Sequence, residues 1–178
     1  MATTARTKAR KAAERAAAPK PKVSRTAARD AIALLESDHR EVDGYFDQYE
    51  ALKDDAAKKK LADKICLALK VHTQIEEEIF YPPARQKTGD GDLLDESVVE
   101  HMGAKNLVAE IESMRPGQNL YDAKVKVLGE QVRHHVKEEE EELFPEVRKT
   151  KLDLAAVGAK LASRKKELMA LLAPPKVV

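Results

Sequence analysis

The chain has 178 residues, of which 35% are charged and only 4% are aromatic, and its formal net charge is +1 at pH 7. This length allows one domain of ordinary size with its own core, and the abundance of Ala, Leu, Glu and Lys predicts an all-α protein. The single cysteine, Cys66, excludes an internal disulfide framework and a cysteine-based zinc or iron–sulfur site, and it fits a reducing compartment.

Residues 1–29 are predicted to form a basic, disordered arm. They contain nine Lys or Arg residues against one acid, Glu14, and almost no large apolar side chain. We favour a solubilising tail, because no aromatic residue stands among the basic ones to stack on bases. The alternative is a tether that binds the phosphates of a nucleic acid. The composition also resembles an organellar transit peptide, but it lacks an amphipathic apolar face.

Apolar residues at steps of three and four predict two helices after this arm. The first covers about residues 30–53 and places His39 in the middle of its apolar stripe. The second begins near residue 54 and should end at residues 82–83, where two prolines stand. The residues predicted to face inward on the second helix are Leu61, Ile65, Ala68, His72, Ile75, Glu76 and Ile79.

A loop rich in Gly and Asp, at residues 88–92, separates this hairpin from a second one. The third helix covers about residues 93–114 and carries His101 inward, before a Pro-Gly pair stops it. The second hairpin therefore starts as the first one does, with a helix that bears a single inward histidine.

The fourth helix covers about residues 119–148 and carries His135 and Glu139 on its inner face. His134 lies about 100° away around the helix, so His135 is the inward histidine of the adjacent pair. An amphipathic stretch at about residues 152–172 then predicts a fifth helix on the outside.

These elements predict an all-α, up-down-up-down four-helix bundle with an additional C-terminal helix and a basic N-terminal arm. The expected divisions are the arm at residues 1–29, the metal-binding bundle at 30–150, and the C-terminal helix and tail at 151–178. No apolar run approaches a membrane span and the start lacks the apolar region of a secretory signal. We therefore expect a soluble, cytoplasmic protein with no membrane partner, either a monomer or a dimer.

The sequence contains an internal repeat. Residues 72–82 recur as residues 135–145, with a histidine, a glutamate, an apolar pair and a proline at the same offsets. In each copy the histidine and the glutamate are four residues apart, so both side chains share one helix face about a turn apart. A lone histidine precedes each copy, His39 by 33 residues and His101 by 34. The repeat therefore describes two hairpins with equivalent metal-ligand types.

Folding these helices into a bundle would bury four histidines and two glutamates in an apolar core. Because an unpaired buried carboxylate or imidazole costs several kcal/mol, this cluster implies a compensating cation. The glutamates could each bridge two ions, and the mixed nitrogen and oxygen donors favour two irons, with manganese or zinc also compatible. The candidate metal ligands are His39, His72, Glu76, His101, His135 and Glu139.

The order of these ligands resembles the hemerythrin family, and specifically its HHE cation-binding branch. The resemblance covers about residues 30–148 and includes the duplicated hairpin and the Phe-Tyr-Pro and Leu-Phe-Pro helix endings. It implies a non-haem di-iron site in a four-helix bundle. Such sites serve reversible dioxygen binding, the sensing of oxygen, iron or redox state, or peroxide and nitric oxide chemistry.

One position departs from the family pattern. Oxygen-carrying hemerythrins have another histidine four residues after the third-helix ligand, and Lys105 stands there in this chain. A lysine ammonium is not a ligand, so one iron would gain an open position, which gives redox reactivity more weight than simple oxygen carriage. Asp43 and His134 are weak candidates to fill the gap, because both lie off the inner stripes.

Two further interpretations concern the carboxylates. Glu77 and Glu140, each next to a candidate ligand, could be outer partners of the metals, but a surface role is favoured for both. A ferritin-like carboxylate bundle requires two Glu-x-x-His motifs on paired helices, whereas this chain has one, at Glu36 and His39. That architecture is therefore disfavoured.

The sequence predicts a non-haem di-iron protein that binds or responds to dioxygen or peroxide as its small ligand. Any enzyme activity is expected to be, at most, slow peroxide consumption or an oxidase-like reaction. One alternative is metal storage or buffering without turnover. The other is a protein tethered to nucleic acid through the basic arm, which is not favoured.

Overall fold

A computed structural model describes residues 30–89 and 91–173, so the predicted basic arm lies outside the described residues. Within the described ranges the secondary structure is entirely helical. The elements are α1 (Ala31–Ala51), α2 (Asp55–Ile75), the π-helical turn η2 (Glu76–Phe80), α3 (Tyr81–Thr88), α4 (Asp92–Ser113), α5 (Tyr121–Glu138), the π-helical turn η3 (Glu139–Leu143), α6 (Phe144–Lys149) and α7 (Leu154–Leu172).

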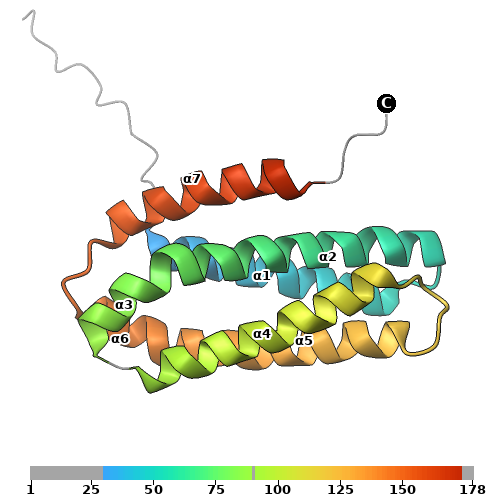
Figure 1. The fold of residues 1–178 in the computed structure, drawn as a ribbon, viewed down its shortest axis with the longest axis horizontal. Coiled ribbons are helices and arrows are strands. Elements are labelled where there is room, and N and C mark those ends of the chain that lie inside the picture. Colours follow the sequence, from blue (N-terminus) through green and yellow to red (C-terminus); the bar gives the residue numbers. More distant parts are fainter. Residues whose placement is uncertain (1–29, 90, 174–178) are drawn as a thin grey trace, which may run out of the picture.

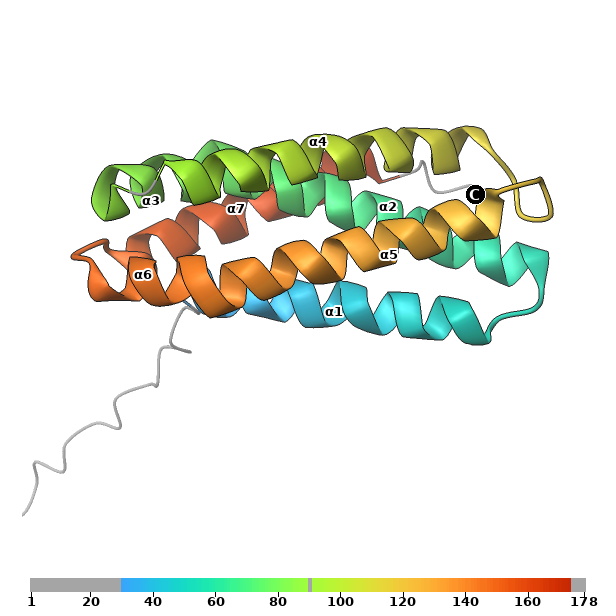
Figure 2. The same ribbon diagram turned by 90° about the horizontal axis from the view of Figure 1, so that it is seen from below.

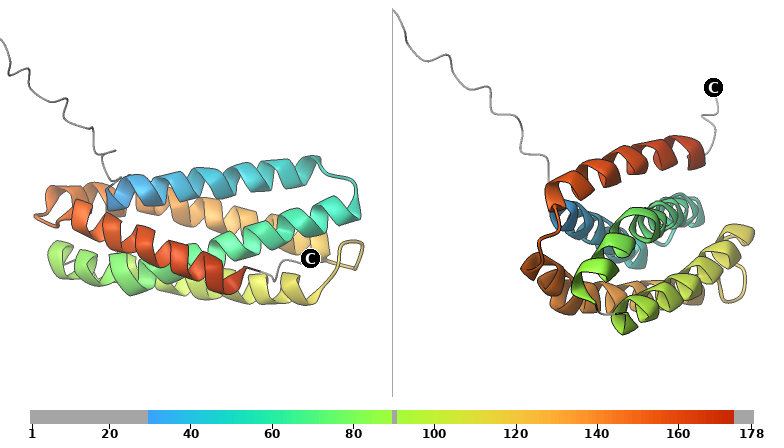
Figure 3. Two further views of the ribbon diagram at one scale, coloured as in Figure 1. Left: turned by 90° about the horizontal axis from the view of Figure 1, so that it is seen from above. Right: turned by 60° about the vertical axis from the view of Figure 1, so that its left-hand side comes forward.

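Four long helical rods form the bundle, and Figure 1 and Figure 2 show them side by side. Helix α1 pairs with α2, and α4 pairs with α5. Helices α3 and α6 extend α2 and α5 beyond the π-helical turns. Helix α7 lies against α1 and α2 on the outside of the bundle, as both views in Figure 3 show. The all-α bundle with an added C-terminal helix is therefore confirmed.

Aspartate side chains fix the start of three helices. Asp30 accepts a hydrogen bond from the backbone N–H of Ala33 at the start of α1, at 2.8 Å. Asp54 and Asp153 cap α2 and α7 in the same way. Each cap satisfies an N–H group that has no partner within the helix.

The prediction that the second helix ends at the two prolines is wrong. Pro82 and Pro83 occupy the first turn of α3, where a missing N–H costs little, because the preceding π-helical turn interrupts the regular hydrogen-bond ladder. The helix ends instead at Gly89, which adopts a left-handed conformation with a φ of 72°.

The π-helical turn also changes which side chains enter the core. A π-helical turn adds one residue to the helical turn and rotates everything that follows it. Ile79, predicted to face inward, is half-buried, whereas Phe80 and Tyr81 are buried. The equivalent turn in the fourth rod likewise leaves Leu143 and Phe144 buried.

The apolar core consists of two clusters, one toward each end of the bundle. One cluster contains Leu35, Phe80 and Phe144 together with Leu161 of α7. The other contains residues of the opposite end, including the buried Cys66. None of the described helices is long and apolar enough to cross a membrane.

Candidate metal centre

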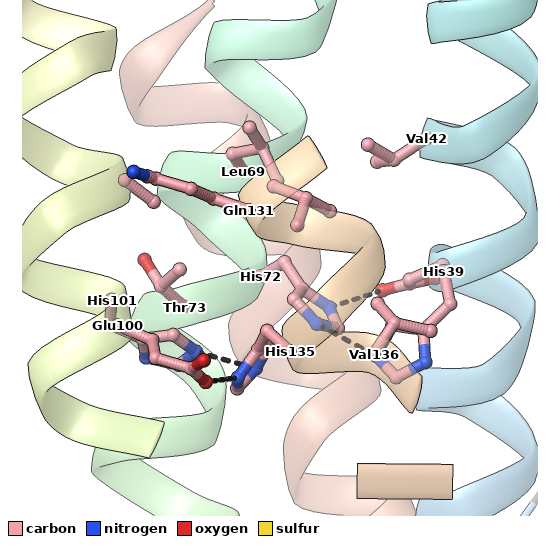
Figure 4. A pocket seen from close by; sticks show the side chains of 13 residues that line it. His39, Val42, Leu69, His72, Thr73, Glu100, His101, Gln131, His135 and Val136 are labelled. Carbon is pink, nitrogen blue, oxygen red and sulfur yellow. Dashed lines mark hydrogen bonds and ion pairs between the residues drawn. The ribbon is translucent and has the colours of Figure 1, made fainter. Parts of the chain in front are cut away.

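The structure brings the six predicted ligands together between the two core clusters. The four histidines come from α1, α2, α4 and α5, and Figure 4 shows them converging on one space between these helices. The two glutamates begin the π-helical turns η2 and η3. All six side chains are buried, and they are His39, His72, Glu76, His101, His135 and Glu139.

The histidines form two pairs of the same geometry. The Nε2 atoms of His39 and His72 lie 3.1 Å apart, and so do those of His101 and His135. Each pair joins the two helices of one hairpin. The repeat seen in the sequence is therefore a structural repeat as well.

Each glutamate lies between the two histidine pairs. The Oε1 atom of Glu76 lies 3.2 Å from His72 Nε2, and its Oε2 atom lies 3.4 Å from His101 Nε2. The Oε2 atom of Glu139 lies 3.3 Å from His39 Nε2 and 3.6 Å from His135 Nε2. Both carboxylates can thus serve two ions at once, one beside each histidine pair.

Unsatisfied buried oxygens supply the test of whether a metal fits here. Within the described parts of the chain, neither carboxylate oxygen of Glu76 has a hydrogen-bond partner, and Oε2 of Glu139 has none. Glu76 is 0% exposed, and a buried carboxylate whose oxygens accept no hydrogen bond is unfavourable unless a cation compensates its charge. Imidazole nitrogens and carboxylate oxygens within 4.8 Å of one another form a donor set suited to transition metals.

A second layer of carboxylates orients the histidines. The Nδ1 atoms of His39 and His101 lie 2.9 Å from Oε1 of Glu140 and Oε1 of Glu77, respectively. Glu140 is exposed and Glu77 is half-buried, yet each accepts a hydrogen bond from a histidine of the other half, so the alternative role as outer partners of the cluster fits both residues better than a surface role alone. Such a bond fixes the ring orientation and leaves Nε2 facing the centre.

The remaining two histidines have carboxylates in equivalent places. His135 Nδ1 lies 2.8 Å from Oε2 of Glu100. His72 Nδ1 lies 3.8 Å from Oδ2 of Asp38, too far for a hydrogen bond but close enough for charge to act. Asp38 and Glu100 each directly precede the lone histidine of their hairpin, so these partners follow the repeat.

The charged groups of the cluster shift the pKa values of His72 and Glu76. Burial disfavours the charged form of His72, but the negative charges of Glu76 and Asp38 outweigh it and raise the pKa of His72 to about 10. Burial by itself would raise the pKa of Glu76, yet His72 and His101 hold that pKa well below its usual value. The cluster therefore holds ionised carboxylates beside positive charge. A metal ion can take the place of that positive charge.

Tyr81 is a site residue that the sequence interpretation missed. Its hydroxyl donates a hydrogen bond to Oε1 of Glu139 at 3.0 Å and lies 3.3 Å from His101 Nε2. Its ring stacks on His101, with centroids 5.5 Å apart. Phe144 takes the equivalent place on His39 at 5.8 Å but has no hydroxyl. The repeat contained the signal, since both aromatic residues stand nine positions after a motif histidine.

Lys105, at the position of the missing histidine, and the two candidates to replace that histidine lie outside the buried cluster. Lys105 binds both carboxylate oxygens of Glu77, at 2.7 and 2.8 Å. Asp43 pairs with Arg133 at 2.7 Å. The side chain of His134 is 62% exposed, which agrees with its predicted orientation away from the inner stripe.

A cavity of about 30 Å³ adjoins the histidines. Its wall includes the apolar side chains of Val42, Leu69, Ala104 and Val132, and Figure 4 shows Val42 and Leu69 beside the imidazoles. A space of this size exceeds the 10–15 Å³ or so that one water molecule requires. The space beside the histidine cluster is therefore large enough for a small ligand.

Known proteins share this sequence pattern and this fold. The hemerythrin HHE cation binding domain family matches residues 30–147. The crystal structure of a hemerythrin HHE cation binding domain-containing protein from Mycobacterium kansasii is similar in fold, with a TM-score of 0.69, 20% identity, and coverage of 80% of this chain and 88% of that one. A DNA nickase from Nostoc sp. is 29% identical over 115 residues, which are 65% of this chain but only 32% of the nickase.

Proposed function

The chain belongs to the hemerythrin HHE cation binding domain family, and from this premise we propose that its cation site holds two iron ions and binds or responds to dioxygen or peroxide. The proposed ligands are the four histidines and two glutamates of the buried cluster. Manganese or zinc would be compatible with the same donors; zinc has no redox chemistry, whereas iron would supply it.

The position of Glu76 carries the proposal. Its two oxygens face histidines of different halves, at 3.2 and 3.4 Å, and neither has a hydrogen-bond partner among the described residues. A carboxylate used only to neutralise one histidine would not need both oxygens directed at separate pairs. This arrangement supports two ions bridged by a carboxylate rather than one.

The surroundings of the cluster favour a small oxidant as the ligand. The buried histidines and glutamates would hold the irons, which would supply electron exchange with a small oxidant. The adjoining cavity has apolar walls and about 30 Å³ of space, which suits a diatomic molecule or peroxide. Tyr81 holds Oε1 of Glu139 through its hydroxyl, so that this oxygen has a fixed orientation. The outer carboxylates hold the imidazoles with Nε2 toward the cluster.

Mixing the reduced, iron-loaded protein with dioxygen or with peroxide tests the proposal. We expect an optical change that reverses on removal of dioxygen or on reduction, or a catalytic loss of peroxide. A storage or buffering protein would keep its iron and show neither response. The Glu76→Gln variant is the matched control, because it removes the bridging charge and should lose the response together with the metal.

A second candidate function is a tether to nucleic acid through the basic arm. Two observations favour it: residues 1–29 carry nine Lys or Arg residues against one acid, and a relative of this chain is described as a DNA nickase. The chain spans about a third of the length of that relative, so nicking activity does not follow from the similarity. The tether predicts only binding to phosphates that weakens with salt.

A gel-shift experiment with and without residues 1–27 tests the tether. We expect the full chain to shift DNA at low salt and the shortened chain to lose this binding. Unchanged binding after the deletion, or no binding by either protein, would contradict the tether.

A further inference from the structure

The two halves of the bundle differ on their outer faces. In the first half, Val71 and Ile75 of α2 are buried, and helix α7 lies against this side. The repeat places His134 and Glu138 of α5 at the equivalent positions of the second half. The described part of the chain places no helix over them, so their side chains are 62% and 24% exposed. Where the first half has a covered apolar pair, the second half therefore has two residues of metal-ligand types at the surface.

The neighbouring carboxylate shows the same difference. In the first half, Asp38 binds the ammonium of Lys165 from α7, with Nζ and Oδ1 2.6 Å apart. Its equivalent in the second half is Glu100, and among the described residues no lysine or arginine forms an ion pair with it. Glu100 instead faces His134 and His135. The position that the Lys165 ammonium occupies beside Asp38 in the first half is therefore open at the surface beside Glu100 in the second half.

We propose that Glu100, His134 and Glu138 form a surface site for one divalent cation of the zinc type, separate from the buried centre. His134 Nε2 lies 3.2 Å from Oε1 of Glu138 and 3.7 Å from Oε1 of Glu100. Ligand atoms around a tetrahedral zinc ion, at about 2.0–2.2 Å from the metal, are separated by roughly 3.3–3.6 Å. The three groups therefore need only small side-chain adjustments, and water would complete the coordination.

The chemistry of the three groups selects the ion. One imidazole and two carboxylates are a donor set for zinc and related transition metals rather than for magnesium or calcium, which prefer oxygen alone. His134 and Glu138 are four residues apart on α5, the same spacing as in the buried motifs. Glu100 of α4 supplies the third ligand, so the ion would also link two helices.

The surface site and the buried centre share one residue. Oε2 of Glu100 lies 2.8 Å from His135 Nδ1, whereas its Oε1 atom faces His134. A cation bound to Oε1 would thus be connected through the Glu100 carboxylate to His135, a proposed ligand of the buried centre. Loss of Glu100 should affect both sites, whereas loss of His134 should affect only the surface site.

Zinc binding by the full chain tests the proposal, with the buried centre filled beforehand and its metal content measured before and after dialysis against zinc. We expect one additional zinc ion per chain in the wild-type protein. His134→Ala and Glu138→Gln should each weaken this additional binding at least about tenfold, with the previously bound metal unchanged, since loss of even an outer partner costs a metal site that much. Glu100→Ala should weaken both sites.

Glu130→Gln is the matched control, because Glu130 is an exposed glutamate one turn before His134 on the same helix. It should bind the additional zinc as the wild type does. Equal zinc binding by His134→Ala and the wild type, or no additional zinc in the wild type, would overturn the proposal. The comparison holds whichever metal fills the buried centre, so its failure is distinct from a failure of the iron proposal.

Discussion

The two hairpins of the bundle, residues 31–88 and 92–149, repeat their innermost groups and differ in what surrounds them. Each contributes a pair of histidines whose Nε2 atoms are 3.1 Å apart and a glutamate that reaches into the other half. Each also supplies an outer carboxylate to a histidine of its partner. The groups nearest the centre are therefore of the same types in both halves, although Glu76 faces the histidine pairs through two oxygens and Glu139 through one.

Farther from the centre the halves differ in three ways. Tyr81 has a hydroxyl at the cluster, whereas Phe144 has none. Helix α7 packs mainly against the first hairpin. His134 stands at the surface where the first hairpin buries Val71. This comparison indicates that the two hairpins share the ligand types of the buried cluster. Each hairpin supports those ligands with different surrounding residues.

Removing either glutamate should have the largest effect and should affect both halves alike. We expect Glu76→Ala and Glu139→Ala each to lower the metal content from about two tightly held ions per chain to one or fewer, because each carboxylate contacts both histidine pairs. Metal analysis after gel filtration measures this. Glu141→Ala, on the surface of the same turn, should retain the metal. Full metal retention in one of the two variants would show that the halves are unequal.

The two adjacent histidines give a sharper form of the same test. His135→Ala should lose at least one tightly held ion, since His135 is buried beside Glu139. His134→Ala should keep the tightly held metal, because its side chain is exposed. Equal losses in the two variants would contradict the assignment of His135 to the cluster.

Helix α7, which packs on the first hairpin, should contribute strongly to the stability of the protein. Leu161 of α7 is 0% exposed in the core cluster that this helix forms with the bundle. Leu161→Ala should lower the free energy of unfolding by about 2–5 kcal/mol, as buried leucine truncations do. Urea unfolding followed by circular dichroism measures it. Met169→Ala, half-exposed on the same helix, should cost much less; equal small effects would mean that α7 does not stabilise the bundle.

Metal binding should release protons and strengthen as the pH rises. In the metal-free protein the charges of Glu76 and Asp38 outweigh burial and raise the pKa of His72 to about 10, so this imidazole is protonated at pH 7–8. It must lose its proton to bind a metal, and each such proton makes affinity rise up to about tenfold per pH unit below that pKa. A pH indicator in weak buffer should record at least one proton released per chain. Loading without release would contradict the account.

Replacing Tyr81 by phenylalanine, the residue type at the equivalent position of the second half, should have the smallest effect. Tyr81→Phe removes the only hydroxyl that donates to Oε1 of Glu139 in the described structure. The free energy of unfolding of the metal-free protein should fall by about 1–3 kcal/mol, the usual cost of leaving a buried acceptor unsatisfied. Urea unfolding gives the value, and Tyr45→Phe, whose hydroxyl pairs with an exposed glutamate, is the control. A stability equal to that of Tyr45→Phe would show that the hydroxyl is dispensable.

The sequence was sufficient for the bundle and for the inward orientation of the candidate ligands, because both depend on spacing along single helices. His39 and His135 could be assigned to inner faces from their neighbours at steps of three and four, and the structure buries both. The π-helical turns were not predictable in this way. They bury Tyr81 and leave Ile79 half-buried, and the apolar steps of three and four do not mark that shift, although the equal spacing of Tyr81 and Phe144 from the motif histidines hints at it.

The outer carboxylates Glu77 and Glu140 were considered from the sequence but not favoured, for a different reason. Glu140 lies in an acidic run that indicates a solvated face, and its partner His39 is 101 residues away. Only the packing of α1 against the fourth rod brings the two together. Contacts between helices decide such pairs, and a single sequence without packing information cannot supply them.

The central claim is a pair of iron ions held by the symmetric set of four histidines and two glutamates. The most direct test is the metal content per chain of protein purified without a metal-affinity tag, together with its ultraviolet and visible absorption before and after reduction. The account predicts about two irons per chain and charge-transfer bands that disappear on reduction. Zinc in their place, or an intact fold with no bound metal, would contradict it.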